Sequence, residues 1–310
     1  MLITQYTEKD KDVWNSFLNE SKNPLFMFNR NYMEYHSDRF EDNSLLFYDE
    51  NKELIALLPL SKNNTVLYSH GGLTFGGFIT TNNMKQHRML ELFENLKTYM
   101  QTNSFTKIVY KVIPHIYHLQ AAEEDIYALK NNNAIIEKIE AATVINLEDR
   151  LKMPKGRKAQ ISRAKREGVE IIESSNYKDF IALENAVLNK HHNATAVHTG
   201  EELEYLHSCF PENIKLFTGI YNGEIIAGAV IYIYKNVIHT QYLAANEKAR
   251  EIGALDYVIS TLLDLYKEKK WFDFGKSTEG DGSILNKGLI SQKEGFGGRT
   301  FVYQTWSMSI

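Results

Sequence analysis

The feature of this sequence that most constrains its fold is a repeated order of elements. In each half of the chain, a predicted β-hairpin is followed by a third strand, a long amphipathic helix and a further strand. The two copies are offset by about 160 to 170 residues, which is far longer than the repeat of a solenoid protein. Hairpins followed by a helix and another strand favour a mixed sheet covered by helices. We therefore predict an α/β protein with mixed, largely antiparallel sheets of the α+β kind, in two similar domains.

The first copy is predicted from hydrophobic patterns with periods of two and 3.6 residues. Ahead of it, Thr7 and Asp10 have the spacing of a capping box, which indicates the start of a helix. The predicted elements are the strand Leu2–Tyr6, the helix Asn29–Ser37, the hairpin strands Ser44–Tyr48 and Glu53–Leu60, the strand Val66–Ser69, the helix Met84–Met100 and the strand Ile108–Val112.

The second copy contains Asn222-Gly223 between two β-rich runs, which is typical of a hairpin turn. The periodicity breaks between Asn146 and Pro154, and a proline can begin a helix. We therefore expect one domain over 1–148 and a second over 149–310. The predicted elements of the second copy are the helices Tyr177–Lys190 and Gly200–Cys209, the hairpin strands Leu216–Tyr221 and Glu224–Tyr234, the strand Val237–Leu243, the helix Leu255–Lys267 and the strand Trp271–Phe274.

Composition and charge indicate an ordinary globular protein. Of the 310 residues 43% are hydrophobic, and the net charge of -4 means that anions would bind only at a local cationic patch. The single cysteine, Cys209, excludes an intramolecular disulfide and fits a reducing compartment; it is either a buried thiol or, with His207 nearby, a nucleophile. The N-terminus lacks the regions of a signal peptide, and no apolar run is long enough to cross a bilayer. We expect a cytoplasmic protein without a membrane span.

A block near the C-terminus, Lys269–Arg299, joins a short apolar strand, a glycine and a cationic helix. It reads KKWFDFGKSTEGDGSILNKGLISQKEGFGGR. This block resembles the "FDFG…GL…FK…FG" pattern of the Fem-type (FemAB-like) branch of the GNAT acyltransferase superfamily, except that Gln292 stands where the family usually has phenylalanine. The resemblance implies two tandem GNAT-like domains, with the last strand, Thr300–Ser307, packing back toward the first. It also implies transfer of an acyl or aminoacyl group to an amine on a sugar or peptide precursor of the cell envelope.

The densest cationic run, KGRKAQISRAKREGVEI, begins the second predicted domain. On a helix, its three- and four-residue spacing places Lys155, Lys158 and Lys165 near one another. Such a face is either a solvated surface or a site for phosphate groups, which arginine binds through two hydrogen bonds. The run resembles the Fem-type block that begins the second domain. The resemblance implies that Arg157 and Arg163 contact the phosphates of a nucleotide-linked or lipid-linked glycan acceptor.

Two residues of the terminal block are candidates for the chemistry. By resemblance, Lys293 is the counterpart of the family's lysine that contacts the donor or stabilises charge on the acyl carbonyl. A fixed cation can lower that barrier, but a lysine in the last turn of a helix is also favoured by the helix dipole. Asp273 could orient or deprotonate the amine, with Lys276 holding it ionised, or it could fix the glycine turn by a hydrogen bond.

The strand Val237–Leu243 carries two further candidates. Tyr242 has a precedent in the family as an aromatic residue near the acceptor, and His239 could bind the substrate. Their odd spacing places them on opposite faces of the strand unless a bulge intervenes. Elsewhere, His191 and His192, followed by Thr195 and His198, suggest a metal site by number, but no cysteine or carboxylate completes a zinc pattern, so we expect a loop histidine cluster and no metal.

The donor is predicted from the segment that precedes the helix Leu255–Lys267. Acyl-CoA-dependent GNAT enzymes hold a pyrophosphate on an Arg/Gln-x-x-Gly-x-Gly/Ala loop at a helix start, where amide groups attract phosphate. By this resemblance Arg250, Gly253 and Ala254 bind the donor, although Leu255 departs from the pattern. Fem-type enzymes that use aminoacyl-tRNA also have a degenerate loop, but they often carry a long helical arm, and no long heptad stretch is present. Acyl-CoA, such as acetyl-CoA, is therefore favoured over aminoacyl-tRNA as cosubstrate.

Two other functions remain open from the sequence. The irregular loop is compatible with a catalytically inactive GNAT-like module that binds a phosphorylated glycan or nucleotide. The cationic run is also compatible with binding to tRNA or other RNA, but it lacks the interleaved aromatic residues on which bases stack.

Overall fold

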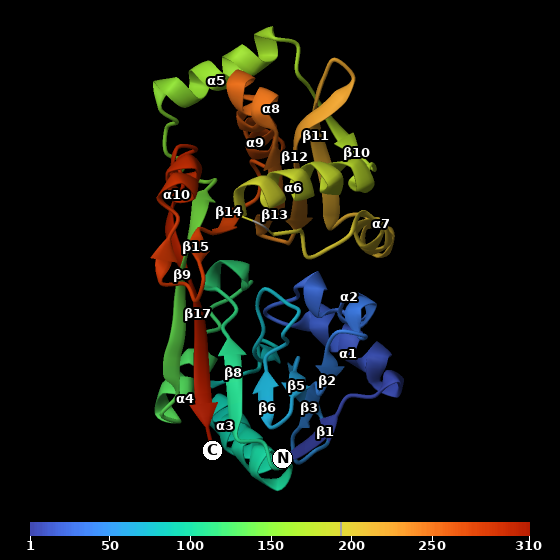
Figure 1. Ribbon diagram of the computed structural model, residues 1–310. Coiled ribbons are helices and arrows are strands. Elements are labelled where there is room, and N and C mark those ends of the chain that lie inside the picture. Colours follow the sequence, from blue (N-terminus) through green and yellow to red (C-terminus); the bar gives the residue numbers. More distant parts are fainter. Residues whose placement is uncertain (193) are drawn as a thin grey trace. The chain divides into compact units, whose positions relative to one another are not determined.

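The chain folds into two compact units, each of mixed α/β structure (Figure 1). The computed structural model describes residues 1–192 and 194–310, and the side chains of all of these except 191 and 192. Strands β9 (Ile135–Asn146) and β17 (Arg299–Ser309) each contribute residues to both units. The prediction of 1–148 and 149–310 included the return of the last strand, Thr300–Ser307, toward the first domain, but it placed the whole of β9 in the first domain. Unit 1 comprises Met1–Glu140, Glu279–Ile284 and Val302–Ile310, and unit 2 comprises Ala141–Thr278 and Leu285–Phe301.

Unit 1 contains two sets of strands, in the orders β1-β3-β4-β7 and β17-β8-β6-β5-β2. The predicted hairpin is confirmed as β3–β4, where Leu45 lies opposite Leu58. β6 and β8 pair in parallel, as expected when a helix connects them. The strands are β1 (Leu2–Gln5), β2 (Glu41–Asp42), β3 (Leu45–Tyr48), β4 (Leu54–Leu58), β5 (Ser61–Asn63), β6 (Val66–Tyr68), β7 (Ile79–Thr80) and β8 (Lys107–Lys111).

The helices of unit 1 follow the predicted positions with two differences. Thr7 and Asp10 form the predicted capping box, but it opens a 3-10 turn that continues into α1 (Lys11–Glu20). The helix predicted at 29–37 is divided into a short α-helix, α2, and a following 3-10 turn. In a 3-10 turn the backbone hydrogen bonds join residues three positions apart, whereas in an α-helix they join residues four apart. The other elements are α2 (Arg30–Met33), α3 (Gln86–Thr102) and α4 (Glu124–Asn131).

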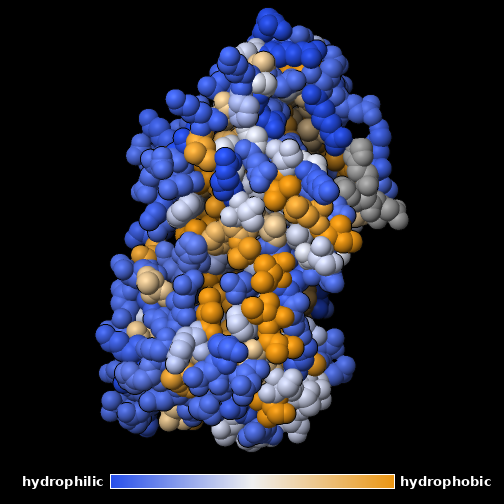
Figure 2. All heavy atoms as spheres, turned by 90° about the vertical axis from the view of Figure 1, so that its left-hand side faces the viewer, coloured by the Kyte–Doolittle hydropathy of each residue, from blue (hydrophilic) through white to orange (hydrophobic). Residues whose placement is uncertain are grey.

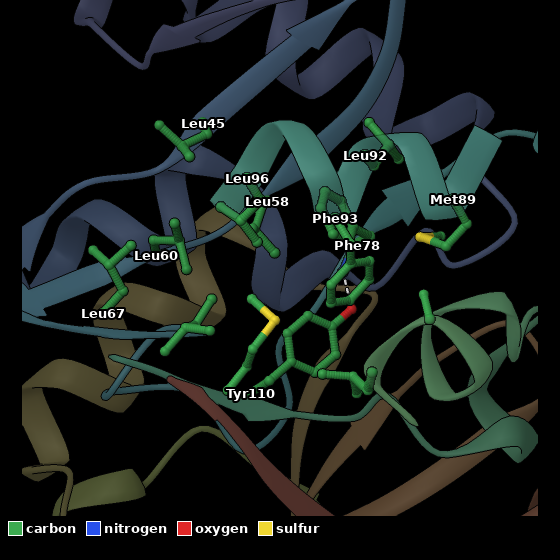
Figure 3. Close-up of a cluster of buried hydrophobic side chains, with 14 of the residues drawn as sticks. Leu45, Leu58, Leu60, Leu67, Phe78, Met89, Leu92, Phe93, Leu96 and Tyr110 are labelled. Atoms are coloured by element: carbon green, nitrogen blue, oxygen red, sulfur yellow. Dashed lines mark hydrogen bonds between the residues drawn. The ribbon is translucent and has the colours of Figure 1, made fainter. Parts of the chain in front are cut away.

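The core of unit 1 is built around Tyr110 of β8 (Figure 3). Its ring lies beneath α3, which presents Phe93 and Leu96 to the core. The Tyr110 hydroxyl accepts a hydrogen bond from the Phe78 amide at 2.7 Å and donates one to the Asp125 carboxylate at 2.8 Å. Burial raises the pKa of Asp125 to about 6. The Phe78 amide, the Tyr110 hydroxyl and the Asp125 carboxylate are thus joined by hydrogen bonds, which offset the free-energy cost of removing these polar groups from water.

Unit 2 contains strands in the order β10-β11-β12-β13-β14-β9. Neighbours are antiparallel except for β13 and β14, which are parallel and are connected through helices, so the prediction of a mixed, largely antiparallel sheet is confirmed. The elements are α5 (Lys155–Arg166), β10 (Glu170–Ser174), α6 (Tyr177–His192), α7 (Gly200–Cys209), β11 (Ile214–Tyr221), β12 (Glu224–Ile233), β13 (Val237–Ala245), α8 (Glu247–Ile252), α9 (Ala254–Leu265), β14 (Trp271–Lys276) and α10 (Lys287–Glu294). The short strands β15 (Thr278–Glu279) and β16 (Ile284–Leu285) pair with each other and are each divided between the two units.

Helices cover both faces of the unit 2 sheet. Ala229 and Ile231 of β12 belong to the hydrophobic cluster that includes Leu262 of α9. Gly228 of the same strand instead faces Phe180 of α6, since a Cβ added there would lie 2.9 Å from that ring. Successive strand residues point to opposite faces, so α6 and α9 lie on opposite sides of β12. Within the described residues, no helix combines the length and apolar character needed to cross a bilayer.

Candidate functional site

The candidate site of unit 2 is the point at which β13 and β14 cease to pair. Their parallel register comprises three residue pairs and ends at His239 opposite Asp273. β13 nevertheless continues to Ala245 and β14 to Lys276. The pairing of β13 with β12 also shifts here, which makes Gln241 the extra residue of a β-bulge. Bulges interrupt pairing and redirect side chains, and they are common beside active sites.

The bulge places His239 and Tyr242 on the same face of the sheet. His239 lies opposite Tyr232 and Tyr242 lies opposite Val230, and these two β12 residues are separated by one position. Directly opposed residues share a face, so the odd spacing does not separate the two candidates. Gly228 has the same parity as Val230, so this is the face covered by α6.

His239 and Asp273 form a buried pair at this point. The His239 Nδ1 lies 3.2 Å from the Asp273 Oδ2, and Asp273 is fully buried. The other Asp273 oxygen accepts a hydrogen bond from the Gly275 amide at 2.7 Å, so the carboxylate is held from two sides. A carboxylate that accepts from Nδ1 orients the imidazole and leaves Nε2 able to accept a proton. The pair thus has the geometry of a general base with an orienting carboxylate.

β14 bends after Asp273, where its pairing with β9 shifts by a β-bulge, and this bend requires glycine. Gly275 has a φ of +69°, in the left-handed region that side chains other than glycine rarely adopt. A Cβ added there would also lie 3.3 Å from the Cε1 atom of His239. A larger residue at this position would therefore strain the backbone and press on the imidazole.

Lys293 fixes α10 to this bend. α10 begins at Asn286, whose side chain accepts a hydrogen bond from the Leu289 amide at 2.9 Å. The Lys293 Nζ is buried and donates to the Gly275 carbonyl at 3.0 Å and to the Lys276 carbonyl at 2.6 Å. Burial lowers the pKa of Lys293 to about 8, and the charge of Asp273 opposes that shift. The Lys276 side chain itself is exposed, so Lys276 contributes its backbone to this arrangement.

We expect Lys293→Met to remove a pH-dependent part of the stability. Burial lowers the pKa of Lys293 from 10.5 to about 8, so the unfolded chain binds more protons between these values. The free energy of unfolding of the wild type should therefore rise with pH across this window, by at most about 3 kcal/mol. Denaturant titrations from pH 7.5 to 10.5 measure it, with the exposed Lys287→Met as control. Equal slopes for the wild type and Lys293→Met would contradict the burial of a charged lysine.

Tyr242 belongs to a second polar cluster that the sequence analysis did not single out. Its hydroxyl lies 2.7 Å from the His198 Nδ1 and 3.2 Å from the His198 amide. Burial raises the pKa of Tyr242 to about 12, and the charge of Glu184 acts in the same direction. Glu184 occupies a position of the buried stripe of α6 that also contains Tyr177 and Phe180. Glu184 follows Tyr177 and Phe180 at three- and four-residue spacing, so its carboxylate interrupts an otherwise apolar stripe. That interruption is the sequence signal from which Glu184 could have been identified.

The structure places the two predicted arginines of α5 in different environments. Arg157 pairs with Asp256, donates to the Gln292 carbonyl at 3.1 Å and lies 4.3 Å from the centre of the Phe296 ring. Arg163 is partly exposed and lies 3.2 Å from Glu251. Arg157 therefore joins three elements of unit 2, whereas Arg163 is a surface group. Whether either contacts phosphate stays a prediction.

The exposed face of α5 is hydrophilic and cationic. The upper end of the surface in Figure 2, where α5 lies, is dominated by hydrophilic side chains. Lys158 and Ser162 of α5 also line a pocket of about 430 Å³ together with Arg150 and Lys152. This pocket offers the local cationic surface that a phosphate group would need.

The predicted donor residues Arg250, Gly253 and Ala254 do not form one open surface. A Cβ added to Gly253 would lie 2.6 Å from the Gln160 carbonyl of α5, and Ala254 is fully buried. Asp256, in the first turn of α9, already supplies an anion at this helix start. Arg250 is exposed and lines a separate pocket of about 350 Å³ with Lys190 and Lys248. Cationic side chains therefore lie beside the loop rather than at the helix start. Of these, Lys190 pairs with Glu247, and Lys248 lies 3.3 Å from Glu251.

Two remaining candidates can be placed only in part. Cys209 is half-buried at the end of α7, and the nearby His207 Nδ1 lies 2.7 Å from the Ile214 carbonyl oxygen. The side chains of His191 and His192 lie outside the described residues. Among the residues that are described, no three histidine, cysteine or carboxylate groups gather as metal ligands would.

Comparison with known proteins identifies the fold. No family model matches the chain, and no curated protein matches it in sequence. Solved structures match over the full length: FemX, with a TM-score of 0.70 and 10% identity, covers 100% of this chain and 98% of its own. L-PGS from Bacillus licheniformis has a TM-score of 0.64 and 12% identity, over 98% of this chain and 92% of its own.

A third match comes from a tandem GNAT protein of the clavulanic acid biosynthesis pathway. It has a TM-score of 0.56 and 8% identity, over 99% of this chain and 98% of its own. At these identities the likeness concerns the fold, and it agrees with the two α/β units and the parallel strand pair in each. The chain therefore has the Fem-like tandem GNAT fold.

Proposed function

We propose that this chain is an acyltransferase that moves an acyl or aminoacyl group from an activated donor to an amine on a sugar or peptide precursor of the cell envelope. The observation that carries the proposal is the His239–Asp273 pair at the end of the β13–β14 register. An amine must lose protons when it becomes an amide, and a histidine held by a carboxylate is suited to accept one. The resemblance of the terminal block to Fem-type enzymes supports the same reaction class.

The surrounding backbone suits the second requirement of acyl transfer. Attack on an ester or thioester places negative charge on the carbonyl oxygen, and fixed N–H groups or a cation lower that barrier. The extra residue of a bulge is not paired in the ladder, so Gln241 offers backbone groups beside His239. Lys293 keeps the Gly275 bend in place and adds a positive charge near Asp273.

For the donor we propose acyl-CoA, such as acetyl-CoA, ahead of aminoacyl-tRNA. Fem-type enzymes that use tRNA often have a long helical arm in the second domain, whereas α6 and α7 contain 16 and 10 residues. The start of α9 is covered by α5, so we assign the donor phosphates to the pocket lined by Lys190, Lys248 and Arg250. Phosphate binds such cationic groups in both donors.

Arg250→Ala is expected to raise the KM for acetyl-CoA about tenfold and to leave kcat within about twofold, since one charge-assisted hydrogen bond to phosphate would be lost. The difference should shrink as salt screens exposed charges. Steady-state kinetics at low and high salt measure it, with the exposed Lys267→Ala as control. An unchanged KM would remove this pocket from the donor site.

The direct test of the function is product formation. The wild type is incubated with acetyl-CoA or with aminoacyl-tRNA, each with amino-sugar nucleotides and peptide amines, and new amides are detected by mass spectrometry. Amide formed from acetyl-CoA supports the proposal, and amide formed only from aminoacyl-tRNA corrects the donor. Binding of a phosphorylated glycan without any amide favours the alternative, a catalytically inactive GNAT-like module.

A further inference from the structure

Glu184 of α6 is a buried glutamate, and one of its two carboxyl oxygens has no partner in the described part of the fold. Its side chain is 6% exposed, and its Oε2 atom is enclosed and has no hydrogen-bond partner among the described residues, which leave out the side chains of 191 and 192. Burial alone raises the pKa of Glu184 to about 7. A buried carboxylate without a donor is costly, and native proteins keep few such groups. A group of this kind is better explained by a ligand than by stability.

Glu184 acts on the same face of the sheet as the predicted site residues. α6 packs on β12 and β13, and the charge of Glu184 raises the pKa of Tyr242 on β13. Tyr242 shares that face with His239, and its hydroxyl contacts His198 from the segment before α7. Glu184 is enclosed to a degree similar to that of two residues of this face, since His239 is 7% exposed and Tyr242 is 9% exposed. The titratable group that responds to its charge is Tyr242.

The reaction itself requires two proton acceptors. A cationic acceptor amine carries three N–H bonds, and the amide product carries one, so two protons must leave the nitrogen. One must leave before attack, because an ammonium has no lone pair. The other leaves after the C–N bond forms and can be passed to the departing thiolate or alkoxide as its bond to the acyl carbon breaks. The His239–Asp273 pair can relay the second proton to the departing group, so the first proton needs an acceptor of its own.

We propose that Glu184 binds the ammonium group of the acceptor and removes its first proton, while His239 removes the second. This assignment rests on the proposed function. It defines the acceptor class as primary amines that are cationic in solution, because a neutral nucleophile would leave the carboxylate without a charged partner. In the resting protein the enclosed carboxylate has no such partner, and an ammonium supplies both the hydrogen bonds and the charge that Oε2 lacks.

The test compares two nucleophiles in the wild type and in Glu184→Gln. Nα-acetyl-lysine amide is cationic at pH 7, whereas hydroxylamine is mostly neutral there. With acetyl-CoA as donor, Glu184→Gln is expected to lower kcat/KM for the lysine amide about 100-fold. With hydroxylamine the variant should stay within about threefold of the wild type, because that nucleophile arrives with its lone pair free. Glu224→Gln, at the exposed hairpin turn, should change neither rate.

The outcomes separate this inference from the proposed function. An equal loss with both nucleophiles, or no loss with the lysine amide, would overturn the role of Glu184. If the wild type acylates neither these nucleophiles nor the amino-sugar nucleotides and peptide amines from any donor, the proposed function fails, and ammonium binding is tested by thermal unfolding. In that case Nα-acetyl-lysine amide should raise the Tm of the wild type and not that of Glu184→Gln; equal shifts would refute the site. The variant should fold, since Gln removes a buried charge, and its Tm without ligand should not fall.

Discussion

Replacing His239 by glutamine is expected to lower kcat for acyl transfer by about 10²- to 10⁴-fold, which is the usual contribution of a positioned general base. The imidazole is held by Asp273 at 3.2 Å, at the end of the β13–β14 register. Glutamine keeps a polar group at this position but cannot accept a proton at neutral pH. Single-turnover rates with the identified donor and acceptor measure the change, because they isolate the chemical step from product release.

Asp273→Asn provides a second, independent test of the same pair. Asparagine can still accept a hydrogen bond from the Gly275 amide, so the bend should be retained. Its amide would donate to the His239 Nδ1, however, and the tautomer able to accept a proton at Nε2 would be lost. A rate near that of His239→Gln, with an unchanged Tm, is expected. His87→Gln, which changes an exposed histidine of α3, serves as control, and wild-type rates for both site variants would refute the assignment.

Much of the fold could be predicted because the signals are local. The Asn222-Gly223 turn fixes the β11–β12 hairpin, and the amphipathic pattern of α3 fixes a helix that buries Leu92 and Leu96. The resemblance implied that the last strand returns to the first unit, but the division of β9 between the two units could not be predicted in the same way. β9 contains 12 residues, but its first half is largely exposed and carries Glu137 and Lys138, so its hydrophobic pattern is weak. The pairing of such a strand is decided by distant neighbours.

The candidate site was only partly accessible to sequence reasoning, for a related reason. The terminal block identified Asp273 and Lys293, but their contacts with His239 and with the Gly275 carbonyl depend on strand register and on α10 packing. The bulge at Gln241 has no sequence signature of its own. From the sequence, His239 and Tyr242 could therefore be placed on one face only if a bulge lay between them. Glu184 was not predicted, because a single carboxylate among the apolar residues of α6 leaves the helix pattern unchanged, and its burial depends on the packing of α6 on the sheet.

Arg157→Ala is expected to lower the free energy of unfolding by about 3 kcal/mol or more, because it would leave Asp256 with its charge unpaired in a largely buried position. The loss would also remove a hydrogen bond to the Gln292 carbonyl and the contact with the Phe296 ring. Arg163→Ala removes an exposed ion pair with Glu251 and should cost less than about 1 kcal/mol. Both variants replace an arginine of α5 by alanine. Urea unfolding measures the difference between their free energies of unfolding.

These two arginines also separate a structural role from phosphate binding. If Arg157 acts through packing, its loss should be recovered in part by the double variant with Asp256→Ala, since no unpaired carboxylate would then remain. If it binds the acceptor phosphates instead, Arg157→Ala should keep its stability and raise the KM for the acceptor. For Arg163, whose side chain is partly exposed, a raised KM with unchanged stability is the expected result. A large loss of stability in Arg163→Ala, with none in Arg157→Ala, would contradict both assignments.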